Sequence, residues 1–111
     1  MSTKSERFDQ AITQQQQGNV EGAIEQLDAL LGDEPDYALA HAALSVFHSR
    51  QGNHEKAVDH GQKVCDLEPT DPFSFVAMSL ICQKAGKTAE AEQALMQARQ
   101  AEIASRHSAS N

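Results

Sequence analysis

The hexapeptide GNVEGA at residues 18–23 recurs with changes as GNHEKA at residues 52–57 and as GKTAEA at residues 86–91. Each copy begins with a glycine and ends with an alanine, and successive copies lie 34 residues apart. A third column keeps the same interval, because Pro35 is followed by Pro69. Three columns in one register indicate an internal repeat of 34 residues that covers nearly the whole 111-residue chain.

Between these markers the apolar residues follow helical spacing, three and four residues apart, as at Leu39, Ala42, Ala43 and Val46. The repeated glycines fit helix C-termini, where a left-handed backbone is needed and glycine adopts it at low cost. The repeated prolines fit helix ends because a proline ring cannot continue the hydrogen-bond ladder. The pattern therefore predicts six helices, at residues 4–17, 20–32, 37–50, 54–67, 71–84 and 88–104.

With this register the chain resembles the tetratricopeptide repeat family, whose motif is W-x2-L-G-x2-Y…A-x3-F…P over 34 residues. In the middle repeat the motif positions fall on His41, Leu44, Ser45, His48, Ala57, Gly61 and Pro69. The resemblance implies an all-α, right-handed α-solenoid of three helix–turn–helix repeats. It divides the chain into a domain at 1–105, with repeats at about 4–37, 38–71 and 72–105, and a flexible C-terminal tail at 106–111.

Three departures from the motif carry information. The first repeat has polar residues where the motif has large apolar ones, as expected for a terminal cap. The third repeat has Ile103 in place of proline, so its second helix can run on. Gly61 stands where the motif has a large apolar side chain, so we expect the middle repeat to be loosely filled.

In this family the first helix of each repeat lines a concave face, in which partners lie as an extended segment or a helix. The matching positions form our predicted partner-binding groove: Phe8, Ile12, Leu39, Ala42, Ala43, Val46, Arg50, Phe73, Val76, Ala77, Leu80 and Lys84. Its floor is mostly apolar and its rim is basic at Arg50 and Lys84, which suits an amphipathic protein segment with an acidic flank. Two alternatives remain for the same residues, which are packing between neighbouring helices and contact with a second copy of the chain.

The same resemblance excludes one kind of ligand. Family members that grip the C-terminal carboxylates of chaperones use a Lys/Asn/Asn/Lys/Arg set in this groove. The matching positions here are Phe8, Ile12, Ala43, Phe73 and Ala77, none of which can hold a carboxylate. We therefore predict a protein-interaction module, an adaptor or chaperone-like scaffold, that is not a carboxylate clamp.

The last predicted helix carries Leu95, Met96 and Ile103 on a side that would normally pack on a following helix. We expect this surface, or the groove, to form a homodimer at moderate concentration. A structural or assembly subunit, acting through self-association or docking in a larger complex, is therefore the alternative function.

Charge and composition argue against other classes of protein. The net charge of −7 disfavours nucleic acid and anionic membranes as partners, because both attract basic surfaces. The chain has no apolar run long enough to span a membrane and no apolar segment after its first charges, so we expect a cytoplasmic protein. Cys65 and Cys82 lie in apolar helical patterns without CxxC spacing, which predicts reduced, packed thiols, with a disulfide or a reactive thiol as the alternative.

The histidines do not predict a metal site. His41 and His48 are seven residues apart on one helix, two turns from each other and too far apart to share an ion. His54 and His60 fall on different helix faces, and no HxxxH or CxxC pair is present. With no phosphate-binding glycine loop either, we expect no cofactor, no metal and no enzymatic activity.

Overall fold

The computed structural model describes the backbone of residues 2–110 and the side chains of residues 2–106. These residues form six α-helices and no strand: α1 (Lys4–Gln16), α2 (Val20–Asp33), α3 (Ala38–Arg50), α4 (His54–Leu67), α5 (Pro72–Lys84) and α6 (Thr88–Ser110). Every boundary except the last agrees with its prediction to within one residue. The predicted all-α architecture is confirmed.

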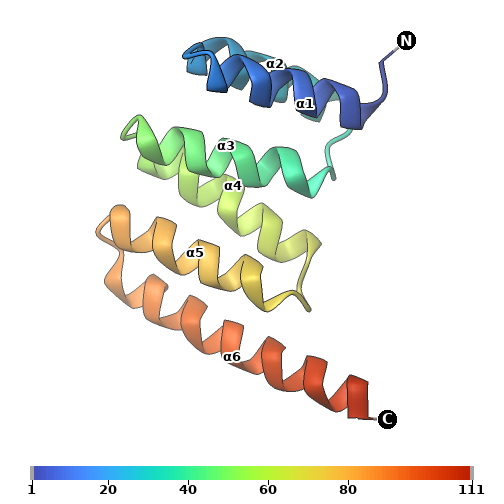
Figure 1. Ribbon diagram of the computed structural model, residues 1–111. Coiled ribbons are helices and arrows are strands. Elements are labelled where there is room, and N and C mark those ends of the chain that lie inside the picture. Colours follow the sequence, from blue (N-terminus) through green and yellow to red (C-terminus); the bar gives the residue numbers. More distant parts are fainter. Residues whose placement is uncertain (1, 111) are drawn as a thin grey trace.

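The helices form three antiparallel hairpins that stack side by side (Figure 1). The hairpin of α1 and α2 lies at one end of the stack, that of α5 and α6 at the other, and the chain termini lie at these opposite ends. The second helix of each hairpin packs on the first helix of the next, and α3 also contacts α5 directly. This stacking of repeats on their neighbours is the arrangement of an α-solenoid.

The repeated glycines form the turn inside each hairpin. Gly18, Gly52 and Gly86 have φ values of 94°, 81° and 77°, in the left-handed region that glycine enters without strain. The residue after each glycine donates its N–H to a carbonyl oxygen five residues earlier, as from Asn53 to His48 at 2.8 Å. This is the Schellman arrangement, which satisfies a helix C-terminus and fixes where the second helix begins.

The buried apolar residues form two clusters, one at each end of the stack. The first spans α1, α2 and α3 and contains large side chains, with Leu27, Leu30 and Leu44 fully buried. The second joins α4, α5 and α6, and half of its buried members are alanines, on α6. The second helix of the last hairpin therefore packs closely on α5 through small side chains.

The last helix is longer than predicted. Helix α6 continues to Ser110, so the predicted helix end at residue 104 was wrong, and the backbone of residues 106–110, which were expected to form a flexible tail, is helical. Ile103 stands where proline would stop the helix, and Arg106 pairs with Glu102 one turn earlier at 2.6 Å. Asn111 lies outside the described residues. Among the described helices none has the length and apolar character needed to cross a membrane.

Candidate functional site

One face of α3 and α5 exposes large apolar side chains. Five of the predicted groove residues on these helices are between 39% and 78% exposed: Leu39, Val46, Phe73, Val76 and Leu80. They recur at three, four and seven residues, so each helix presents a continuous stripe. Exposed apolar residues gathered on one face are characteristic of an interaction surface, whereas single ones are normal.

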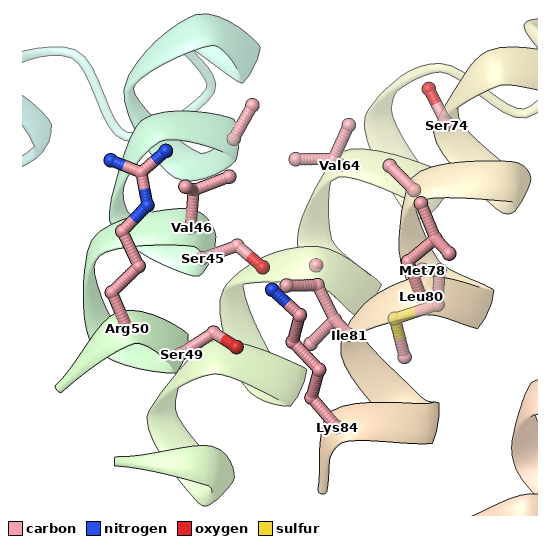
Figure 2. Close-up of a pocket in the computed structure, with 13 residues that line it drawn as sticks. Ser45, Val46, Ser49, Arg50, Val64, Ser74, Met78, Leu80, Ile81 and Lys84 are labelled. Atoms are coloured by element: carbon pink, nitrogen blue, oxygen red, sulfur yellow. The ribbon is translucent and has the colours of Figure 1, made fainter. Parts of the chain in front are cut away.

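A cavity of about 250 Å³ opens between α3, α4 and α5, and we call it the Gly61 pocket after the glycine that lines it. Six of the predicted groove residues also line it, three from α3 and three from α5: Ala42, Val46, Arg50, Ala77, Leu80 and Lys84. Figure 2 shows Val46 and Arg50 on α3 across the pocket from Leu80 and Lys84 on α5. The structure thus brings together the central part of the predicted groove.

Gly61 lies on α4, where the pocket reaches between the first helices. A Cβ atom at this position would lie 2.9 Å from Met78 Sδ and 3.2 Å from Ser45 Oγ. The backbone of α4 therefore approaches both first helices closely, and no side chain projects from residue 61 into the space. Loose filling was expected at Gly61, but Met78 and Ser45 lie close against the glycine itself, and the cavity opens beside them.

The predicted groove contained only the positions of the first helices that face the concave side of the solenoid. Six other residues that line the pocket were therefore not predicted: Ser45, Ser49, Val64, Ser74, Met78 and Ile81. The departure of Gly61 from the motif was the signal that could have found them, because a missing side chain exposes its neighbours. Ser45 Oγ donates to the Ala57 carbonyl oxygen at 2.8 Å. Ser49 Oγ is buried and has no hydrogen-bond partner among the described residues.

The predicted groove residues at the contact between α1 and α3 contribute differently from their prediction. Phe8, Ile12 and Ala43 are partly buried against the first core cluster and do not line the Gly61 pocket. The Phe8 ring meets the Tyr37 ring edge-on at a centroid distance of 6.0 Å. For these residues packing between helices, one of the alternatives left open by the sequence, describes the observed contacts.

A second cavity, of about 430 Å³, lies between α5 and α6 and joins two predicted surfaces. Phe73 and Val76 from the predicted groove line it together with Leu95 from the predicted self-association surface. Met96 and Ile103 are exposed on α6 without lining it. Of the twelve predicted groove residues, six line the Gly61 pocket and two line this α5–α6 hollow, while Phe8, Ile12, Leu39 and Ala43 line neither.

Three histidines form a cluster between α3 and α4. His41 Nε2 lies 2.8 Å from the Pro35 carbonyl oxygen, which can only accept, so the Nε2–H donates. Neutral His41 then has a bare Nδ1, which accepts the Nδ1–H of His60 at 3.0 Å. The His48 ring stacks on the His60 ring with a centroid distance of 5.8 Å and an interplanar angle of 4°.

Two rings of this cluster, those of His48 and His60, favour the neutral form. Burial lowers the pKa of His60 below 6.5, the two neighbouring imidazoles lower it further, and Asp28 and Asp59 act in the opposite direction. Burial also lowers the pKa of His48, with Lys56 adding to the effect and Asp28 opposing it. The cluster was not predicted because His60 was compared only with its neighbour on the same helix. Within the described residues, no group of three or more His, Cys, Asp or Glu side chains is arranged to hold a metal ion.

The two cysteines are buried and unpaired. Burial, with a contribution from Asp66, raises the pKa of the Cys65 thiol to about 11, and burial also raises the pKa of Cys82. Cys65 Sγ donates to the Ser74 carbonyl oxygen at 3.4 Å. Because the thiolate is the nucleophile, these raised pKa values describe packed thiols of low reactivity.

Comparisons with known proteins agree on the architecture. A family model described as tetratricopeptide repeat matches residues 8–72, whereas no curated protein matches the chain. A crystal structure of MamA has a TM-score of 0.84 and 18% identity over 95% of this chain and 61% of its own. The Yersinia enterocolitica type III secretion translocator chaperone SycD has a TM-score of 0.78 and 20% identity over 96% of this chain and 87% of its own. This chain spans about three fifths of that MamA chain, and these identities show a shared fold alone.

Proposed function

Because this chain belongs to the tetratricopeptide repeat family, we propose that it is a protein-interaction module that binds an amphipathic segment of a partner protein along α3 and α5. The observation that carries the proposal is the exposure of five large apolar side chains on one face of these two helices. The module acts by binding and catalyses no reaction. SycD, which shares the fold, is a translocator chaperone, and a chaperone-like or adaptor role is the one we propose here.

The predicted affinity is modest. A segment that covers about 400 Å² of apolar surface gains about 10 kcal/mol, at about 25 cal/mol per Å². Association costs about 4–15 kcal/mol in lost freedom of the two molecules. The net gain is then at most about 6 kcal/mol, so a short peptide should bind at about tens of micromolar or more weakly. A tighter partner must contact more of the protein.

The test uses peptides selected from a random library on the full chain. The selected peptides are synthesised, and their dissociation constants are measured by fluorescence anisotropy for the wild type and for Val46→Glu. Val46 is exposed on α3, so the charged side chain can point into solvent while it removes apolar surface from the groove. We expect binding to weaken by about tenfold or more. Unchanged binding would remove the groove from the proposal.

A matched control places the same kind of change outside the groove. Met96 is 63% exposed on α6 and lines neither cavity. Met96→Glu should leave peptide affinity within about twofold of the wild type, because Met96 makes no contact with a peptide bound along α3 and α5. Circular dichroism on both variants ensures that a loss of binding reflects the surface and not the fold.

A structural or assembly role through self-association is a second candidate, supported by the exposed Met96 and Ile103 on α6. Met96→Glu then has a further use, since it should lower the average mass measured by light scattering at high micromolar concentration. A wild type that is monomeric under those conditions contradicts self-association through α6. A change of mass with Val46→Glu, and no peptide selected, favours self-association through the groove.

A further inference from the structure

The Gly61 pocket has the size and the walls of a site for a single side chain. Its volume of about 250 Å³ exceeds the roughly 150 Å³ of an engineered apolar protein cavity that binds benzene. Its walls are mainly aliphatic, with Val46 from α3, Val64 from α4 and Leu80 from α5 (Figure 2). Met78 forms part of the wall, and its unbranched thioether can adapt to different occupants.

The pocket exists because this chain departs from its own repeat. The positions equivalent to Gly61 are Leu27 in the first repeat and Leu95 in the third. Leu27 is fully buried in the first core cluster, so the space beside α2 is filled from within. At Gly61 there is no side chain, Met78 and Ser45 lie against the glycine instead, and the cavity opens beside them, where an apolar group from outside can contact its walls.

The mouth of the pocket is positively charged. Arg50 and Lys84 are exposed, lie at equivalent positions of two repeats and both line the pocket, and none of its lining residues is acidic. The ion pairs formed within the described residues, Arg7 with Asp33 and Arg106 with Glu102, involve neither of these cations. In a chain with a net charge of −7, two such cations beside an apolar pocket complement an anionic ligand.

One further group in the pocket lacks a partner. Ser49 lies between Arg50 and Lys84 in Figure 2, and its buried Oγ has no hydrogen bond within the described residues. Ser45, by contrast, is satisfied by the Ala57 carbonyl. Buried hydroxyls are nearly always hydrogen-bonded, so Ser49 marks a place where a main-chain group of a ligand can bind.

We propose that the Gly61 pocket receives one bulky apolar side chain of the partner segment, and that acidic side chains beside this anchor bind Arg50 and Lys84. The inference rests on the proposed function and adds the partner's chemistry to it. The anchor is aliphatic or aromatic. The carboxylates belong to aspartate or glutamate side chains of the segment and not to its C-terminus.

The experiment uses variants that fill the pocket and measures their dissociation constants for the peptides selected above. Gly61→Leu copies the residue of the first repeat, and its side chain must displace Met78, which lines the pocket, into that space. Ala77→Phe enters the pocket from an exposed position on α5, so it preserves the test if Gly61→Leu fails to fold. Ala29→Phe, at an exposed alanine of α2 away from the pocket, is the matched control. We expect both pocket variants to bind about tenfold more weakly than the wild type and the control.

A double-mutant cycle assigns the anchor. Replacing the apolar anchor of the peptide by alanine should weaken binding to the wild type by about tenfold or more, and should have little further effect on Gly61→Leu. Replacing the acidic residues of the peptide by their amides should weaken binding to the wild type and leave Arg50→Gln/Lys84→Gln unchanged. Amidation of the peptide C-terminus should have no effect, which separates side-chain carboxylates from a chain end.

The outcomes separate the two proposals. If Val46→Glu abolishes binding while Gly61→Leu and Ala77→Phe bind as the wild type does, the groove stands and the pocket inference is wrong. If the selected peptides lack either an apolar anchor or acidic neighbours, the inference is also wrong. If binding is indifferent to Val46→Glu and to both pocket variants, the proposed function and the inference fail together.

Discussion

Leu27 and Gly61 occupy the same position in successive repeats, and their surroundings differ accordingly. Leu27 is fully buried among apolar neighbours of α1, α2 and α3, and the first repeat is closed. Gly61 is also buried, but it lines a cavity that opens between α3, α4 and α5. The backbone of the two hairpins follows one pattern, and the presence of leucine or glycine at this position goes with core in the first repeat and with a pocket in the second.

The largest expected effect comes from truncating the buried side chain of Leu27. Leu27→Ala should lower the free energy of unfolding by about 2–5 kcal/mol, because it removes buried methyl groups and leaves a cavity. Urea denaturation measures the change. Leu95→Ala, at the equivalent position of the third repeat, is the control, and should cost clearly less because Leu95 is 44% exposed. Equal losses at both positions would show that burial does not distinguish the repeats as the structure indicates.

The turn glycines test the statement that the repeats share one backbone. Gly18→Ala and Gly52→Ala should each cost about 1–2 kcal/mol, because alanine at a positive φ is strained although no atom lies within 4 Å of the added Cβ. Gly32→Ala is a control with the opposite sign, since Gly32 lies inside α2 in open space and gains helix propensity, up to about 1 kcal/mol. Thermal and urea unfolding measure all three, and a large difference between the two turns contradicts a common geometry.

Sequence reasoning succeeded for the fold because local chemistry repeats three times. The glycines, prolines and helical spacing set the helix boundaries without reference to distant contacts. The end of α6 was missed because Ile103 removes the stop signal, while the polar residues after it resemble a tail. The site was only partly predictable, since the pocket depends on how α4 lies against two other helices. His60 was missed for the same reason, because its partners His41 and His48 belong to another helix.

The histidine cluster gives the middle repeat a pH dependence that the first repeat lacks. The positions of His41, His48 and His60 are Arg7, Gln14 and Gln26 in the first repeat, and none of these titrates near neutrality. Because the pKa values of His48 and His60 are lowered in the folded state, the unfolded chain binds protons more readily as the pH falls. This contribution to stability is fully present above pH 6.5, the ordinary value, and is lost as the pH falls through the folded pKa values.

The midpoint of urea unfolding, followed from about pH 8 to about pH 5.5, measures this loss of stability. Most carboxylates titrate below this pH range, so the histidines dominate the change. The midpoint should be constant at the upper end and fall below pH 6.5 in the wild type. His60→Gln copies the first repeat and should flatten the curve, because it removes one titrating ring and the repulsion of its neighbours. His54→Gln, on the same helix as His60 and outside the cluster, is the control for losing a histidine from α4. A curve unchanged by His60→Gln contradicts the observed cluster.

The smallest expected effect is the one that tests the comparison most directly. Gly61→Ala gains about 1 kcal/mol of helix propensity. Against this, the new Cβ would lie 2.9 Å from Met78 Sδ and 3.2 Å from Ser45 Oγ. The Met78 sulfur lies near the end of a flexible chain beside the cavity and can move into it, whereas Ser45 is held by its bond to Ala57. The two terms nearly cancel, so the stability should change by less than about 1 kcal/mol in either direction.

Urea unfolding of Gly61→Ala beside Gly32→Ala compares a helix alanine that meets neighbours with one that meets none. Gly32 lies next to the end of α2 and gains less propensity than Gly61 inside α4, so the difference between the two variants gives a lower bound on the cost of the contacts with Met78 and Ser45. A difference below about 2 kcal/mol agrees with a cavity that has room for the displaced side chain. A larger one means that the walls around Gly61 are as tightly packed as those around Leu27. The middle repeat would then have no space to offer an external side chain.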